Sequence, residues 1–123
     1  LVYAVDGTSS FHASAAELVT EALTKGIACI HEIVLQEFFS IVTNPKKVRE
    51  SWSADKAAKF IYDIKKAAAE IHYLDSDTID EAFSSAQEFN IQRYGIYDHL
   101  IATSMRLRGI KEIITANVSD FRR

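Results

Sequence analysis

Hydrophobic positions along the chain fall into two patterns, short continuous apolar runs and longer stretches with helical spacing. The first run covers residues 1–5 and ends at the turn-forming pair Asp6-Gly7, which favours a strand. Similar runs at residues 27–30, 71–74 and 111–115 predict three further strands. Strands are therefore expected at both ends of the chain and between its helices.

Apolar residues three and four positions apart mark the amphipathic helices between these runs. The spacing predicts five helices, at about residues 9–26, 32–44, 53–70, 75–89 and 97–108. Ser53 can cap the third of them, and Asp75 or Ser76 can open the fourth. Gly26 and Gly109 stand where the first and last helices are expected to end.

Strands that alternate with helices predict a mostly parallel sheet covered by helices on both faces. A chain of 123 residues has the size of one domain, and we see no repeat or linker in it. We therefore expect a single three-layer α/β/α domain over residues 1–123. Because the chain opens within an apolar run and closes just after the last expected strand, we expect it to be truncated at both ends.

Composition is that of an ordinary soluble globular protein, with 48% hydrophobic and 25% charged residues. The single cysteine, Cys29, excludes a disulfide framework, and its apolar neighbours predict a small buried side chain. We therefore expect a cytoplasmic protein with no membrane partner. The net charge of −3 argues against a nucleic-acid binder that relies on an overall basic surface.

Three acidic residues stand out by their positions. Glu37 lies beside apolar residues of the second expected helix. It is either a residue at the edge of the helix that reaches water or a carboxylate that faces a polar cleft. Asp98 lies in the first turn of the last helix, where an acid can also cap the helix or favour its dipole. Asp120 and Asn117 follow the last expected strand, where α/β sites lie, although both types are common in turns.

Together these acids can form a metal site, because carboxylates on separate elements that meet at one sheet edge supply the oxygen ligands that Mg²⁺ or Mn²⁺ prefers. Such a cluster needs a cation, since neighbouring carboxylates cannot all stay ionised without one. The four histidines share no ligand spacing, so we do not expect a histidine metal site.

Four segments resemble, in the correct order, the motifs of PIN-domain ribonucleases. They are residues 1–6 with Phe11-His12-Ala13, the segment 34–38 around Glu37, the segment 97–102 that begins Tyr97-Asp98, and the segment 114–121 that ends Asp120-Phe121. The last two are fairly specific together, whereas Glu37-Phe38 alone would be weak. The short chain and the forms of these motifs favour the VapC branch of the family, whose members are toxins inhibited by VapB antitoxins.

The resemblance implies an α/β/α fold and a Mg²⁺- or Mn²⁺-dependent endoribonuclease that hydrolyses RNA phosphodiester bonds. It assigns Glu37, Asp98 and Asp120 as catalytic residues and metal ligands. Asn117 would orient the substrate or a ligand-bound water, and Thr115 would supply a supporting hydroxyl. In some members of the family an acid occupies the position of Asn117. Whether Asn117 or Asp120 lies closer to the metal therefore stays open. RNA and a VapB-like antitoxin are the expected partners, and we expect a homodimer.

One departure from the family concerns its first catalytic Asp, in an Asp-Thr-Asn motif that would lie upstream of Leu1. Asp6 stands at the far end of the first run and does not replace it. The alternative to a nuclease is therefore an inactive PIN-fold binding or regulatory module. A receiver-like domain is a further alternative, with Asp75 after the third expected strand, but Asp6 lacks the neighbouring acid that such a domain needs.

Overall fold

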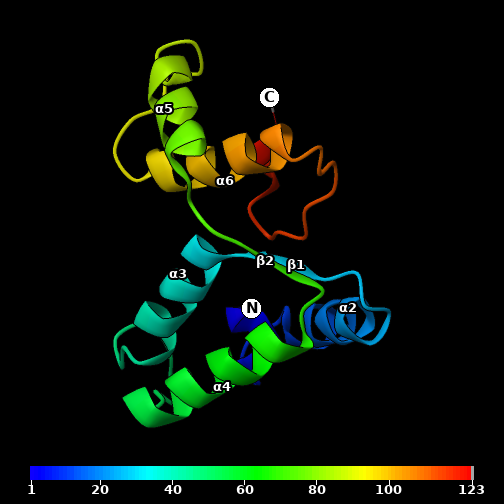
Figure 1. Ribbon diagram of the computed structural model, residues 1–123. Coiled ribbons are helices and arrows are strands. Elements are labelled where there is room, and N and C mark those ends of the chain that lie inside the picture. Colours follow the sequence, from blue (N-terminus) through cyan, green and yellow to red (C-terminus); the bar gives the residue numbers. More distant parts are fainter. Residues whose placement is uncertain (123) are drawn as a thin grey trace. The chain divides into compact units, whose positions relative to one another are not determined.

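A computed structural model of the chain describes residues 1–122, in two compact units, Leu1–His72 and Tyr73–Arg123. The first unit contains α1 (Val2–Val5), α2 (His12–Thr24), β1 (Cys29–His31), α3 (Glu32–Val42), α4 (Ala54–Ala67) and β2 (Glu70–His72) (Figure 1). The second unit contains α5 (Ser76–Ser85), α6 (Gly95–Leu107) and the short 3₁₀ helix η1 (Val118–Phe121). The five amphipathic helices expected from the sequence are present as α2 to α6.

The two strands of the first unit pair in parallel, with Cys29 opposite Glu70 and His31 opposite His72. The expected strands at residues 27–30 and 71–74 are thus confirmed, with ends shifted by one or two residues. α3 follows β1 directly and contacts it. The α/β class with parallel strand pairing is therefore confirmed.

The strand expected at residues 1–5 is wrong, because this run forms the helix α1. The Asp6 N–H donates to the Val2 carbonyl at 3.0 Å, which is the spacing of a helical turn. Val2 and Val5 pack against the core of the first unit, whereas Tyr3 is exposed. A short apolar run fits a buried strand and a buried helical turn equally well, so the pattern alone could not separate them.

The strand expected at residues 111–115 is also wrong, because the segment forms no strand in the described part of the chain. A strand has no hydrogen bonds of its own and is stable only when it pairs with a neighbour. Residues 111–114 are exposed, and Ile114 keeps 60% of its surface in contact with solvent. The segment is apolar as a strand would be, but an apolar pattern carries no information about whether a pairing partner is present.

Aromatic rings fill the core of the first unit. Phe38 is 1% exposed, stacks on Phe60 at 5.0 Å between ring centroids, and meets Trp52 edge-on at 5.8 Å. Val42 and Ala57 complete the buried cluster. α4 begins at a true cap, because the Ser53 hydroxyl accepts the Lys56 N–H at 3.1 Å, as the sequence predicted.

The core of the second unit lies between α5 and α6, which pack against each other. Buried His99 places its Nε2 atom 3.1 Å from the Ala82 carbonyl and 3.0 Å from the Ser85 hydroxyl, so this imidazole joins the two helices. Asp75 caps α5, as expected, by accepting the Thr78 N–H at 2.8 Å. Gly109 adopts a φ of 69° after α6, the left-handed conformation that suits glycine at a helix end.

Cys29 is exposed, so its expected burial is wrong. The segment of Cys29 has an apolar sequence, but burial of a strand residue depends on what covers that face of the sheet. No helix within residues 1–122 combines the length and apolar character needed to cross a membrane.

Candidate functional site

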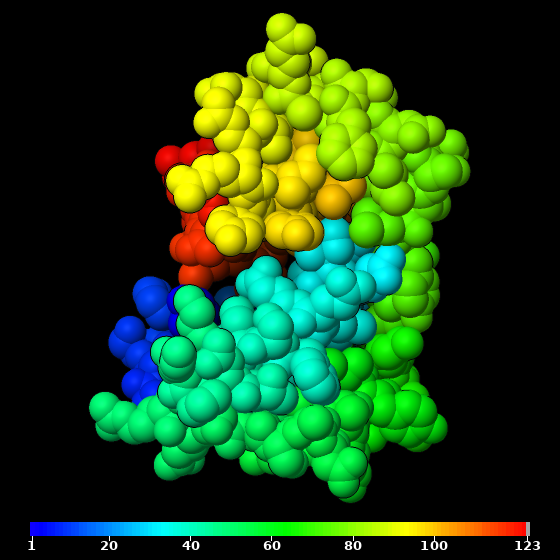
Figure 2. Space-filling view, turned by 90° about the vertical axis from the view of Figure 1, so that its left-hand side faces the viewer, coloured from blue at the N-terminus to red at the C-terminus, as the bar shows by residue number. Residues whose placement is uncertain are grey.

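Glu37 lies in the second turn of α3. The helix starts immediately after β1, where the Nδ1 atom of His31 accepts the Ile33 N–H at 3.2 Å and acts as the cap. Its buried face consists of Ile33, Leu35, Phe38 and Val42. Glu37 is exposed, and part of α3, cyan in Figure 2, lies at the molecular surface. The Glu37 carboxylate is thus open to a ligand.

The start of the chain lies within electrostatic reach of Glu37. Burial lowers the pKa of the Leu1 amino group, and the negative charge of Glu37 partly offsets this effect by favouring the charged amine. Leu1 also packs against the core cluster that contains Phe38, the neighbour of Glu37. The backbone at Leu1 therefore runs close to this carboxylate.

Asp98 lies in the first turn of α6 and is partly buried. The cap position of this helix belongs to Tyr94, which makes no side-chain cap bond, so Asp98 is not the capping residue. Its place in the first turn puts the carboxylate at the positive end of the helix dipole, which stabilises a negative charge. The next two residues, His99 and Leu100, are buried, and Asp98 lies at the border of that buried face.

Asn117 and Asp120 lie in and beside η1. The Asn117 N–H donates to the Thr115 hydroxyl at 3.0 Å, and the Asn117 carbonyl accepts the Asp120 N–H at 3.1 Å. Asn117 and Asp120 are exposed, whereas Thr115 is partly buried. Thr115 and Asn117 therefore shape the turn that presents Asp120 to solvent.

The second unit brings together the elements of two predicted ligands, because α6 with Asp98 contacts η1 with Asp120. Glu37 belongs to the first unit. All three side chains offer carboxylate oxygens, so their chemistry fits Mg²⁺ or Mn²⁺. Joint coordination of one site by the three residues stays a prediction.

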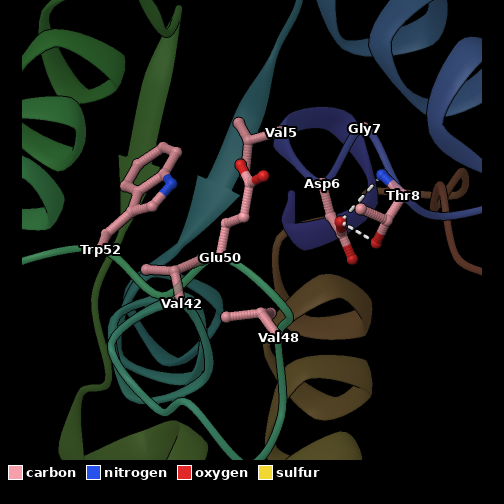
Figure 3. Close-up of a pocket in the computed structure, with 8 residues that line it drawn as sticks. All are labelled: Val5, Asp6, Gly7, Thr8, Val42, Val48, Glu50 and Trp52. Carbon is pink, nitrogen blue, oxygen red and sulfur yellow. Dashed lines mark hydrogen bonds between the residues drawn. The ribbon is translucent and has the colours of Figure 1, made fainter.

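A pocket of about 250 Å³ in the first unit has no counterpart in the sequence analysis (Figure 3). Its polar lining comes from Asp6, Thr8 and Glu50, and its apolar lining includes Trp52. Glu50 lies outside the helices and strands, where the spacing of apolar residues does not predict which way a side chain points. The only signal for this pocket in the sequence is the Asp6-Gly7 turn.

Asp6 is held within that turn. Its Oδ1 atom accepts both the Thr8 hydroxyl at 2.6 Å and the Thr8 N–H at 3.0 Å. The hydroxyl bond, followed by the backbone bond, lowers the pKa of Asp6 below its usual value. These bonds orient the carboxylate as part of the turn. That Asp6 does not replace the first acidic residue of the PIN motifs stays a prediction.

Comparison with known proteins identifies relatives of the chain along its whole length. Two curated relatives are both named Ribonuclease VapC24, one from Mycobacterium tuberculosis strain CDC 1551 / Oshkosh and one from strain ATCC 25618 / H37Rv. Each is 23% identical over 121 residues, which cover 98% of this chain and 83% of the relative. The family model of the PIN domain matches residues 1–123. Because that match spans every element of both units, the chain belongs to the PIN domain family.

Proposed function

We propose that the chain is a metal-dependent endoribonuclease of the VapC type, which hydrolyses phosphodiester bonds in RNA. The observation that carries this proposal is the PIN domain match over residues 1–123, with acidic residues at the motif positions of three separate elements. The similarity to a protein named Ribonuclease VapC24 supports the choice of RNA as substrate. One PIN-like domain over residues 1–123 is part of this proposal.

In this proposal Glu37, Asp98 and Asp120 hold a Mg²⁺ or Mn²⁺ ion. When bound, such an ion lowers the pKa of a coordinated water and stabilises the charge that develops on the leaving oxygen. The exposed amide of Asn117 orients the substrate or a water beside Asp120. Thr115 supports this arrangement through its bond to the Asn117 N–H.

The decisive test is the substitution Asp98→Asn in the full-length protein, assayed for RNA cleavage with Mg²⁺ or Mn²⁺. Loss of a ligand charge should slow cleavage by about 100-fold or more, since even residues that support ligands cost 10- to 100-fold. Asp77→Asn is the matched control, because Asp77 is an exposed acid in the first turn of α5. It should cleave at the wild-type rate.

Calorimetric titration of both variants with Mn²⁺ separates a metal effect from a folding effect. Asp98→Asn should weaken Mn²⁺ binding while its thermal unfolding midpoint stays near that of Asp77→Asn. Undiminished cleavage by Asp98→Asn would overturn the assignment of this residue.

The alternative function is a PIN-fold binding or regulatory module without nuclease activity. It is favoured by the absence of an Asp-Thr-Asn motif from residues 1–123. The upstream reading frame separates the two functions, because an in-frame Asp-Thr-Asn segment restores the nuclease and its absence favours the binding module.

We further propose that the protein is a cytoplasmic homodimer whose activity is inhibited by a VapB-like antitoxin. Co-expression with the product of the neighbouring small gene should yield a stable complex in which RNA cleavage is suppressed. Light scattering should give twice the chain mass for the protein alone. A monomer mass would contradict the homodimer. Cleavage that persists in the complex would contradict inhibition by the antitoxin.

A further inference from the structure

A thiol, a carboxylate and an imidazole meet on one face of the paired strands. Cys29 on β1 lies directly opposite Glu70 on β2, and His72 is two residues further along β2. Paired residues of a parallel sheet, and residues two apart on one strand, point to the same face. The donor atoms of these three side chains all lie within 4.8 Å of one another.

We propose that Cys29, Glu70 and His72 form a binding site for Zn²⁺ or a similar thiophilic divalent cation. A thiolate and an imidazole favour such ions, whereas Mg²⁺ and Mn²⁺ prefer sites made of oxygen. The site shares no residue with the proposed nuclease site and does not depend on that proposal. Its three donors leave the fourth position of a tetrahedral ion to water or an external ligand.

The distance between the Glu70 and His72 donors is close to the value that zinc requires, and every donor pair lies within 4.8 Å. Bond lengths of 2.0–2.3 Å place the donors of tetrahedral zinc roughly 3.3–3.7 Å apart. The His72 Nδ1 atom already lies 3.7 Å from the Glu70 Oε1 atom. Cys29 and Glu70 are both exposed, so their side chains can move toward an ion without disturbing buried structure.

His72 supplies the one buried donor of the cluster. Its side chain is only 8% exposed, so the ring is fixed in the sheet with its Nδ1 atom directed toward Glu70. The Nε2 atom is buried and has no hydrogen-bond partner among residues 1–122. The buried ring thus holds its Nδ1 atom near the exposed Glu70 carboxylate, while the unpaired Nε2 atom is the other ring nitrogen.

The same feature limits the affinity. A metal ion on Nδ1 leaves the ring proton on Nε2, where no acceptor is present among residues 1–122, and histidine ligands usually donate this proton to a partner. With three ligands and this cost, we expect weaker binding than at closed four-ligand zinc sites. The bound ion would join β1 to β2 by bonds to both strands.

The test uses Co²⁺ as a spectroscopic substitute for Zn²⁺ in the full-length protein. Because Cys29 is the only cysteine in residues 1–123, a thiolate-to-cobalt charge-transfer band that is lost in Cys29→Ser reports on this site. Cys29→Ser and Glu70→Gln should weaken Zn²⁺ binding by about 10-fold or more, as loss of a ligand or its partner does. Glu17→Gln, an exposed acid on α2, is the control and should bind Zn²⁺ as the wild type does.

Protection of the thiol gives a second measurement that does not depend on a variant. Zn²⁺ should slow the reaction of Cys29 with a thiol reagent, and a chelator should restore the reaction. An unprotected thiol at saturating Zn²⁺, or Zn²⁺ binding that is unchanged in Cys29→Ser, would overturn the proposal. Neither result bears on the nuclease, which the Asp98→Asn assay tests by itself.

Discussion

Asp75 carries two structural interactions on a single exposed side chain. One oxygen accepts the Thr78 N–H at the start of α5, and the other lies 3.3 Å from an Arg108 guanidinium nitrogen. Arg108 also donates to the Tyr73 carbonyl at 3.1 Å and to the Ser104 hydroxyl. Asp75 therefore links the start of α5 to the end of α6.

The pH dependence of stability should reflect this carboxylate. Hydrogen bonding to Thr78, followed by the charge of Arg108, lowers the pKa of Asp75 in the folded protein. A lowered folded pKa contributes stability above the unfolded value of about 3.9, and this stability is lost as pH falls through the lower folded pKa. The difference in thermal midpoint between wild type and Asp75→Ala should thus be largest near neutral pH and shrink in acid.

Asp77→Ala is the control for this measurement, since Asp77 lies in the same turn and makes no capping bond. Its midpoint should change less than that of Asp75→Ala, because Asp77 interacts with the helix dipole but makes no bond to Thr78 or Arg108. If the thermal midpoint of Asp75→Ala lay below that of the wild type by the same amount from neutral pH into acid, the contribution of the charged carboxylate would be contradicted.

Residue positions were predictable from sequence to different degrees. Ser53 and Asp75 could be identified as caps because a cap is a local feature with its own residue preference. The cluster of Cys29, Glu70 and His72 could not be identified, because it depends on the register between two strands that are far apart in the sequence. No local spacing contains that information.

At the scale of elements, α3 carries both core residues of the first unit and a candidate metal ligand. Phe38 contacts Phe60 and Trp52, while Glu37 beside it points to solvent. The helix is held by this aromatic cluster, so its core face determines where Glu37 lies.

Truncation of Phe38 should therefore destabilise the protein strongly. Phe38→Ala leaves a cavity beneath α3 and should lower the free energy of unfolding by about 3–5 kcal/mol, as buried aromatic truncations do. Phe83→Ala is the matched control, because Phe83 is 64% exposed, and it should change that free energy by less than about 0.5 kcal/mol. Denaturant titration measures both, and equal losses would contradict the aromatic core described above.

Helices were predicted better than strands for a physical reason. The helical period of α2 to α6 is a property of each segment, and four of these helices are eleven to fourteen residues long. A strand needs a partner, and residues 111–115 carry strand-forming side chains without pairing. The run that forms α1 is too short for its period to be recognised.

At the scale of the whole molecule, the proposed nuclease site draws on both units. Glu37 comes from the first, and Asp98 and Asp120 come from the second, while the PIN domain match covers both. The order of the motifs along the chain could be seen in the sequence. Their joint coordination of a metal stays a prediction, because it depends on tertiary structure that periodicity does not encode.

The direct passage from β1 into α3 has a geometric consequence. His31 ends the strand and caps the helix, so no connecting residue separates them. One residue inserted after His31 would turn each later side chain by about 100° around the helix axis and advance it by about 1.5 Å. The direction in which Glu37 points around the axis of α3 thus depends on the number of residues at that junction. An insertion or deletion there would turn the carboxylate away from its present direction.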